Sequence, residues 1–235
     1  MLGRVYTAVP AAGSGIRMGL GYSKAFVDVE GLPLLSRTLR ALLKSPFIDQ
    51  ITTAVRPDEV DLCEREVVAK AGLVDGVSVS EGGRERQQTV WNLLNAAPAH
   101  RDLVLIHDGA RPLVSLPVIH DVLEAALEWG AATAAVLLTD TVKESADGGE
   151  TVSKTLDRKR LFRAQTPQAF HRDLIVSAHR RALKEDWSVT DDASLIEQLG
   201  HDVRLVKGDV RNIKVTTPDD LELVRWVILS QGSKL

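Results

Sequence analysis

Apolar and polar residues alternate along this chain in two different patterns. Short, nearly continuous apolar runs predict β-strands at 4–9, 51–55, 102–107, 131–138 and 202–206. Amphipathic stretches predict helices at 33–45, around Cys63, and at 84–97, 116–129 and 218–230. Strands that are apolar throughout favour a sheet with helices on both faces, so we expect a layered α/β fold. The last helix should begin at Pro218, with Thr217 as its N-cap.

The segment at about 140–165 departs from this pattern. β-Branched residues flank an Asp147-Gly148-Gly149 turn, which predicts a β-hairpin. Its strands are polar and charged, so they offer little apolar area for packing on the sheet. We expect a protruding arm that finds cover on another subunit, with an exposed surface hairpin as the alternative. No repeat or linker marks a second domain, so residues 1–235 are expected to form one domain with this arm.

The composition narrows the class of protein. It is 44% hydrophobic and 26% charged, as in ordinary globular proteins, and the net charge of −3 gives no reason to expect a nucleic-acid partner. The single cysteine, Cys63, lies on an apolar helix face and should be a buried thiol, which leaves no disulfide framework or cysteine zinc site. No apolar run approaches the length of a membrane span or a signal-peptide core, so we expect a cytoplasmic protein without membrane association.

The segment VPAAGSGIRMGLGYSKAF, at 9–26, follows the first predicted strand and is rich in small residues. A glycine-rich loop in this place lets backbone N–H groups approach phosphate oxygens. It is not a dinucleotide fingerprint, because Met18 stands where the third glycine belongs, and it lacks the P-loop spacing. Arg17 and Lys24 could neutralise a polyphosphate there, or they could be ordinary solvated residues.

Two further loops carry candidate chemistry. Asp108 directly follows a buried strand, at the edge where open α/β sheets bind ligands, and a carboxylate there would suit Mg²⁺; capping the next turn is the alternative. His107 is a poor metal candidate, since the histidines form no H-x-x-x-H pair. The loop EGGRERQQTV, at 81–90, has glycine, arginine and threonine donors that could contact a base or ribose, or could simply form a turn and helix cap.

Seven motifs, in order, resemble the 2-C-methyl-D-erythritol 4-phosphate cytidylyltransferase family. They are PAAGSGIRMG (10–19), GGRERQQTV (82–90), VLIHDGARP (104–112), DTVKES (140–145), LDRKRLFRAQTPQAF (156–170), TDDASLIEQLG (190–200) and NIKVTTPDDL (212–221). The resemblance covers nearly the whole chain. It implies a Rossmann-like nucleotidyltransferase fold with a mostly parallel sheet, a homodimer formed through the arm, and transfer of a cytidylyl group from CTP to 2-C-methyl-D-erythritol 4-phosphate in the non-mevalonate isoprenoid pathway.

The resemblance also implies roles for particular residues. The nucleotide would be bound by Pro10, Ala11, Ala12, Gly13, Ser14, Gly15, Gly82, Gly83, Arg86, Thr89 and Asp108. Arg17, Lys24 and Lys214 would be catalytic, stabilising charge at the reacting phosphorus, and Asp108 would hold Mg²⁺. The acceptor phosphate would be surrounded by Asp108, Arg111, Thr166, Thr190 and Lys214, together with Thr141 and Arg158 on the arm of the neighbouring subunit.

The implied chemistry needs cations more than a protein base. A phosphate monoester has a second pKa of about 6, so the attacking oxygen is largely ionised near neutral pH. This agrees with the lack of an evident Ser/His/Asp or Cys/His arrangement in the sequence. The attack brings two anions together, and fixed positive charges reduce their repulsion.

The chain departs from the family pattern at three places. It has Ser23-Lys24-Ala25 for Pro-Lys-Gln, Gly109 for an alanine, and Thr89 for a serine. None of these removes a needed charge. Two alternatives stay open: a ribitol-5-phosphate cytidylyltransferase, whose first loop typically has Ala-Gly-Gly where this chain has Ala11-Ala12-Gly13, and a non-catalytic nucleotide-binding protein with the same fold.

Overall fold

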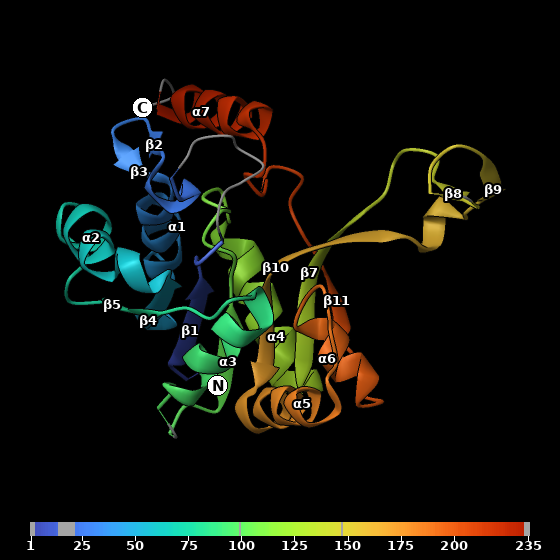
Figure 1. Cartoon of the computed structure of the whole chain (residues 1–235), viewed down its shortest axis with the longest axis horizontal. Coiled ribbons are helices and arrows are strands. Elements are labelled where there is room, and N and C mark those ends of the chain that lie inside the picture. Colours follow the sequence, from blue (N-terminus) through green and yellow to red (C-terminus); the bar gives the residue numbers. More distant parts are fainter. Residues whose placement is uncertain (1–2, 14–21, 99, 147, 233–235) are drawn as a thin grey trace.

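A seven-stranded sheet forms the centre of the computed structural model, which describes residues 3–13, 22–98, 100–146 and 148–232 (Figure 1). Its strand order is β11-β7-β10-β6-β1-β4-β5. The strands are β1 (Val5–Pro10), β4 (Ile48–Val55), β5 (Val77–Glu81), β6 (Leu103–Ile106), β7 (Ala131–Leu137), β10 (Phe162–His171) and β11 (Arg204–Lys207). The five strands expected from the sequence are all present, whereas β5 and β10 were not predicted.

All pairings in this sheet are parallel except those of β10, which runs antiparallel to both β6 and β7. The predicted mostly parallel α/β sheet is therefore confirmed. Since β1, β4, β5 and β6 run in the same direction, the loops at their carboxyl ends all lie along one edge. In open α/β sheets this edge is where ligands bind.

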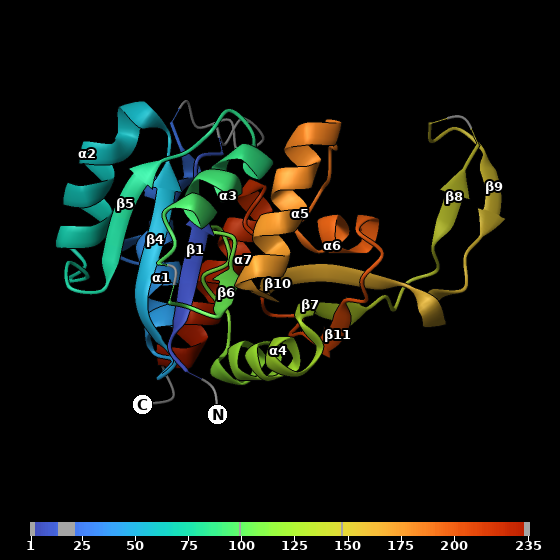
Figure 2. The same cartoon turned by 90° about the horizontal axis from the view of Figure 1, so that it is seen from below.

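Helices cover both faces of the sheet (Figure 2). The seven helices described are α1 (Leu34–Leu43), α2 (Val60–Cys63), α3 (Arg86–Asn95), α4 (Leu116–Trp129), α5 (Arg172–Glu185), α6 (Ala193–Gln198) and α7 (Pro218–Gly232). Side chains of α1, α2 and α4 pack in one core cluster with Val5 and Val9 of β1. Side chains of α3, α5 and α6 pack in a second cluster with Tyr6 and Ala8. Successive side chains of β1 thus point alternately into two separate cores, as expected for a buried strand.

Smaller elements complete the fold. A single turn of 3-10 helix at Lys24–Phe26 leads into the short hairpin of β2 (Asp28–Val29) and β3 (Leu32–Pro33). α2 continues into a π-helical stretch at Glu64–Ala69. Cys63, at the end of α2, is fully buried, and burial raises the pKa of its thiol to about 12, so it is the inert structural cysteine that was predicted. None of the described helices has both the length and the apolar character needed to cross a membrane.

The predicted hairpin is present but shorter than 140–165. β8 (Lys143–Ser145) and β9 (Val152–Thr155) pair antiparallel and project away from the body of the molecule (Figures 1 and 2). All seven side chains of these two strands are exposed in the single chain. From Phe162 onward the chain no longer belongs to the arm, because it pairs with β7 in the central sheet.

Candidate active site

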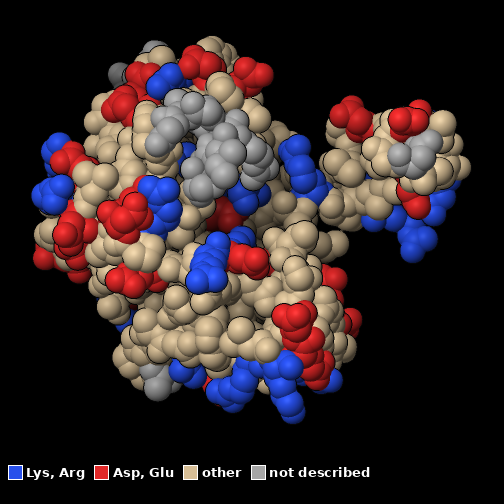
Figure 3. Space-filling view, viewed as in Figure 1, with Lys and Arg blue, Asp and Glu red and all other residues tan. Residues whose placement is uncertain are grey.

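A cavity of about 620 Å³ opens at the carboxyl ends of β1, β4, β5 and β6. Its lining consists of Pro10, Ala11, Ala12, Gly13, Lys24, Ala25, Leu34, Arg56, Pro57, Asp58, Gly82, Gly83, Arg84, Glu85, Arg86, Thr89, Asp108, Gly109, Ala110 and Lys214. Most of the residues expected to bind nucleotide are therefore brought together. Ser14, Gly15 and Arg17 lie outside the described residues. Figure 3 shows Lys and Arg side chains at the rim of a hollow in this face, with acidic atoms at its floor.

The loop after β1, at Ala11 and Ala12, and the loop after β5, at Gly82, are both held against the end of β4 by backbone hydrogen bonds. The Ala11 N–H donates to the Ala54 carbonyl at 2.7 Å, and the Gly82 N–H donates to the Val55 carbonyl at 2.6 Å. A Cβ atom at position 82 would lie 2.4 Å from the Cβ of Ala12. Only glycine therefore allows the two loops to approach so closely.

Replacing Gly82 with alanine is expected to displace one of these loops and to weaken nucleotide binding by about 10-fold or more, because small shifts of binding groups have large effects. Equilibrium binding of CTP to the purified variant measures this. Gly3→Ala is the matched control, since an added Cβ there has no atom within 4 Å. Equal affinities of the two variants would contradict the assigned role of this contact.

Thr89 is buried and lines the cavity, but its hydroxyl is already engaged within the loop. It accepts from the Gly83 N–H at 3.0 Å and donates to the Glu85 carbonyl at 2.9 Å. These bonds tie the first turn of α3 to the loop before it, although the N-cap of α3 is Glu85 and not this threonine. A contact of Thr89 with base or ribose stays a prediction. The arrangement holds the backbone of Gly82 and Gly83 against the cavity.

Asp108 lies where three cations converge. Its carboxylate is 2.9 Å from Lys214 Nζ, 3.3 Å from Arg111 Nε and 3.5 Å from Arg86 Nε. Burial by itself would raise the pKa of Asp108, but the charges of Lys214, Arg86 and Arg111 outweigh it and hold that pKa well below its usual range. Asp108 therefore stays ionised, and it gathers the positive side chains at the end of β6.

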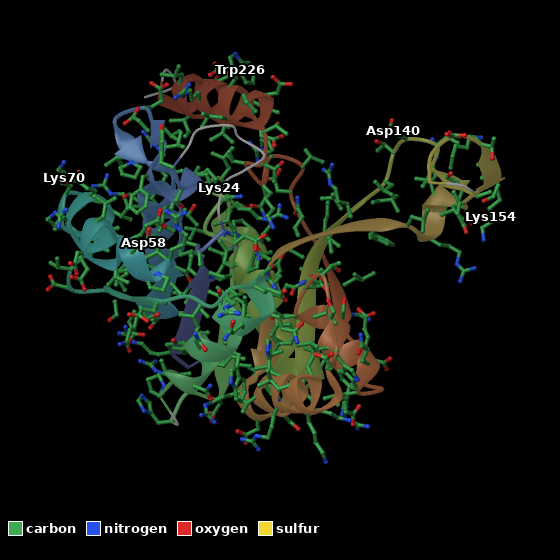
Figure 4. All side chains as sticks on the ribbon, in the orientation of Figure 1. Lys24, Asp58, Lys70, Asp140, Lys154 and Trp226 are labelled. Carbon is green, nitrogen blue, oxygen red and sulfur yellow. The ribbon has the colours of Figure 1, made fainter. Side chains whose placement is uncertain are left out.

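The two lysines expected at the reacting phosphorus are held near each other. Lys24 Nζ donates to the carbonyl of Val215, the residue after Lys214, at 3.1 Å. The Val215 N–H in turn donates to the Ala110 carbonyl at 2.9 Å, which fixes this segment beside the Asp108 loop. In Figure 4, Lys24 lies in the middle of the molecule, whereas Lys70 and Lys154 lie at its margins.

The segment that carries Lys214 is also tied to α7. The Asp220 carboxylate accepts from the Thr216 and Thr217 N–H groups at 2.8 and 2.9 Å, and the Asp220 N–H donates to Thr217 Oγ1 at 3.3 Å. Thr217 is therefore the N-cap of α7, as predicted. This reciprocal capping stiffens the chain just beyond the lysine.

A second cavity of about 220 Å³ adjoins the first and contains five of the seven residues expected around the acceptor. It is lined by Arg86, Asp108, Arg111, Ala164, Gln165, Thr166, Gln168, Thr190, Asp191 and Lys214. Arg86, Asp108 and Lys214 line both cavities. Thr141 and Arg158, also expected at the acceptor, line neither cavity: they lie on the arm side, where Arg158 donates to the Thr139 carbonyl at 2.6 Å.

His107 is buried and organises the second cavity from behind, a role that the sequence did not reveal. The Thr166 hydroxyl accepts from the Asp108 N–H at 2.9 Å and donates to His107 Nδ1 at 3.2 Å. His107 Nε2 must then carry the proton, because it faces the Arg111 carbonyl at 3.1 Å. Burial lowers the pKa of His107 to about 4, so the ring is neutral near pH 7.

Other supporting residues were also missed. The side-chain amide of the buried Asn212 donates to the Thr166 backbone carbonyl at 2.7 Å, and the backbone carbonyl of Asn212 accepts from Arg111 Nη1 at 2.8 Å. Gln168 accepts from the Asp192 N–H at 3.2 Å and donates to Asp191 Oδ2 at 2.7 Å, which holds the segment after Thr190 against β10. Asn212, Gln168 and Asp192 all lie in motifs that the sequence analysis singled out, but a sequence pattern does not show which of its polar residues point inward.

The fold matches solved structures over nearly its whole length. The structure of 4-diphosphocytidyl-2C-methyl-D-erythritol synthase from Anaerococcus prevotii superposes with a TM-score of 0.84 at 28% identity, covering 97% of this chain and 100% of the other. That of 2-C-methyl-D-erythritol 4-phosphate cytidylyltransferase from Thermus thermophilus gives 0.78 at 35% identity, covering 95% and 98%. The sheet and its helices form the Rossmann-like fold of a nucleotidyltransferase.

Sequence comparison narrows the class further. The profile of the family described as 2-C-methyl-D-erythritol 4-phosphate cytidylyltransferase matches residues 5–230. Proteins of that name from Pelotomaculum thermopropionicum and Syntrophus aciditrophicus are 41% and 44% identical, each over 99% of this chain and over 97% and 99% of their own lengths. The chain belongs to this family.

Proposed function

We propose that the protein transfers a cytidylyl group from CTP to 2-C-methyl-D-erythritol 4-phosphate, releasing pyrophosphate, as a step of the non-mevalonate isoprenoid pathway. The observation that carries this is the junction of two cavities at one group of charges, Asp108, Arg86 and Lys214. The larger cavity would hold the nucleotide and the smaller one the acceptor phosphate. The attacking oxygen and the α-phosphorus would then meet between the two lysines and Arg86. A single free, buried thiol agrees with a reducing cytoplasmic setting.

The proposed roles follow from charge. Two like unit charges 4 Å apart repel by about 4 kcal/mol at an effective dielectric constant of about 20. Lys24, Lys214 and Arg86 line the larger cavity and Arg111 the smaller one, so attack would occur among fixed positive charges. Arg17, outside the described residues, is proposed to add to them from the first loop. No step requires a protein base, because the acceptor phosphate is ionised near neutral pH.

Magnesium is proposed as the cofactor, held by Asp108 together with the nucleotide phosphates. Among the described residues, the group of three potential metal ligands is His120, Asp121 and Glu124 on α4, and none of them lines either cavity. Mg²⁺ usually takes only one or two protein carboxylates, with phosphates and water as its other ligands, so Asp108 would be a sufficient protein ligand once the nucleotide phosphates are bound. When bound, the ion would neutralise phosphate charge. Loss of turnover with EDTA and its return on adding Mg²⁺ would support this proposal.

Pyrophosphate release tests the reaction and its acceptor. Purified protein with CTP and Mg²⁺ is assayed with 2-C-methyl-D-erythritol 4-phosphate and, separately, with ribitol 5-phosphate. The proposal expects turnover with the first acceptor and little with the second. Preference for ribitol 5-phosphate would reassign the acceptor, and CTP binding without turnover on either would indicate a nucleotide-binding protein that is not an enzyme.

We further propose a homodimer in which each arm covers the partner's second cavity. Two observations support it: the β8–β9 hairpin is wholly exposed in the single chain, and Thr141 and Arg158 line neither cavity of their own chain. Val152 on the arm and Phe162 at its base are also exposed apolar residues, 63% and 45% accessible, which a partner would cover.

Mixing two inactive variants tests this arrangement. Lys24→Met damages the body of the site, and Arg158→Ala damages the arm. If arms act on the partner, random mixed dimers contain one intact site, and equal mixing should restore roughly a quarter of wild-type turnover. Subunits are exchanged by mild denaturation and refolding, with each variant alone as the control. No recovery despite proven mixed dimers would refute the exchange of arms.

A further inference from the structure

Arg86 stands at the junction of the two cavities and is held from two sides. Its Nε lies 3.5 Å from Asp108 Oδ1, and its Nη2 lies 2.7 Å from Asp192 Oδ2. Arg86 is the first residue of α3 and lines both cavities. Asp108 is shared with Lys214 and Arg111, so it cannot fix the direction of this guanidinium alone.

Asp192 cannot contact a substrate itself. Its side chain is 1% exposed, and it lines neither cavity. It is held firmly behind Arg86: its Oδ1 accepts from His179 Nε2 at 3.1 Å, and its backbone N–H donates to Gln168 Oε1 at 3.2 Å. The carboxylate is therefore a fixed anchor and not a mobile group.

The two residues that hold Asp192 are themselves locked in place. Gln168, in β10, is buried and donates to Thr133 Oγ1 at 2.9 Å and to Asp191 Oδ2 at 2.7 Å. The His179 ring, on α5, stacks on Trp91 of α3 with centroids 6.3 Å apart. α3, α5 and β10 thus converge on this one carboxylate.

The contact between Asp192 and Arg86 is an ion pair. Burial alone would raise the pKa of Asp192, but Arg86 and His179 outweigh this effect and lower that pKa. The carboxylate is therefore ionised near neutral pH, and it attracts a guanidinium that is always charged.

We propose that Asp192 is a positioning residue for nucleotidyl transfer, holding the Arg86 guanidinium at the cavity junction where it meets the phosphates of the bound nucleotide. The inference rests on the proposed function. A free arginine side chain must lose rotational freedom when it binds a phosphate, and an anchor that fixes it beforehand lowers that loss. Asp192 supplies this anchor from a buried position, so the anchor does not compete with the substrate.

A double-mutant cycle in kcat/KM for CTP tests the proposal. Asp192→Asn keeps the size of the side chain but removes the charge, and kcat/KM is expected to fall about 10- to 100-fold. In an Arg86→Gln background the same substitution should change kcat/KM by less than about two-fold, because the residue through which it acts is gone. An equal loss in both backgrounds would show a merely structural role and overturn the proposal, as would an unchanged kcat/KM for Asp192→Asn.

Arg86→Lys provides a second test that does not alter Asp192. Lysine keeps a charge beside the buried carboxylate but has a single cationic nitrogen, so it cannot bridge two carboxylates with separate nitrogens. We expect a loss similar to that of Asp192→Asn, and wild-type kcat/KM in Arg86→Lys would overturn the inference. Asp49→Asn is the control: its carboxylate pairs with Arg101 at 3.1 Å near the start of β4, at the opposite end of that strand from the cavity, and kcat/KM should stay unchanged.

Equilibrium binding of CTP separates this inference from the proposed function. Wild-type protein that shows no turnover with either acceptor would refute the function. The same cycle measured in the Kd for CTP would then decide the role of Asp192: weakening only when Arg86 is present supports it, and any other pattern overturns it.

Discussion

Replacing Lys24 with methionine is expected to lower kcat by about 10²- to 10³-fold, the usual effect of removing one group that stabilises transition-state charge. Methionine retains an unbranched apolar stem, so the substitution removes the charge with little change in packing. Lys24 lines the larger cavity, and its Nζ is held 3.1 Å from the Val215 carbonyl, next to Lys214. That position suits charge developing where the two cavities meet.

Steady-state pyrophosphate release gives kcat, and thermal unfolding shows whether the variant is folded. Lys70→Met is the matched control, because Lys70 is exposed, lies outside both cavities and pairs with Glu66 (Figure 4). Its kcat should equal that of the wild type. A folded Lys24→Met variant with nearly normal turnover would show that this lysine is an ordinary surface cation.

Replacing Asp108 with asparagine is expected to reduce both stability and turnover. Removing one charge from a buried group leaves its partners uncompensated, at a typical cost of 3–5 kcal/mol. We expect about 3 kcal/mol here, because Lys214 is 37% exposed and can turn partly toward water. Turnover should fall about 100-fold or more, since Asp108 holds Arg86, Arg111 and Lys214 in place.

Urea unfolding measures the stability change. The control is Asp173→Asn, which removes a carboxylate that is 98% exposed and paired only at the surface, so the free energy of unfolding should change by less than about 1 kcal/mol. Equal changes for the two variants would show that the three cations contribute nothing to holding Asp108.

The stability effect of Asp108 should also depend on pH. The folded-state pKa of Asp108 is depressed, because Lys214, Arg86 and Arg111 outweigh the opposing effect of burial, whereas an unfolded aspartate titrates at about 3.9. Its contribution is therefore fully present above the unfolded pKa and is lost as the pH falls toward the folded one. The difference in unfolding free energy between wild type and Asp108→Asn should shrink from pH 6 to pH 3. A constant difference would contradict the pairing.

Hydrophobic periodicity predicted the strands that are apolar throughout, and it missed β10 for a physical reason. β10 carries Gln165, Thr166 and Gln168 into the middle of the sheet, where each is almost fully buried. Their polar groups bond to neighbouring strands and loops, as Gln168 does to Thr133 and Asp191. In sequence such a strand looks like a polar surface segment, because periodicity does not show which polar groups have partners inside the protein.

The residues of the candidate site also divide into those that the sequence indicated and those that it did not. Gly13, Lys24 and Asp108 could be proposed because they lie in the loops after two predicted strands, and the carboxyl ends of parallel strands meet at one edge. Asp192, His107 and Asn212 could not be predicted in this way. They act through side chains that reach back from other elements, so only the three-dimensional packing shows their partners.

Gly109 limits how this chain can be recombined with its relatives. A Cβ atom at this position would lie 3.0 Å from both Ala11 Cβ and Leu35 Cδ1. The space that a side chain at position 109 would need is therefore already filled by the loop after β1 and by α1, which lie far from Gly109 in sequence. Chimeras that place an alanine at this position would need the loop at Ala11 and the start of α1 from the same parent, so crossover points should be placed to inherit these three segments as one block.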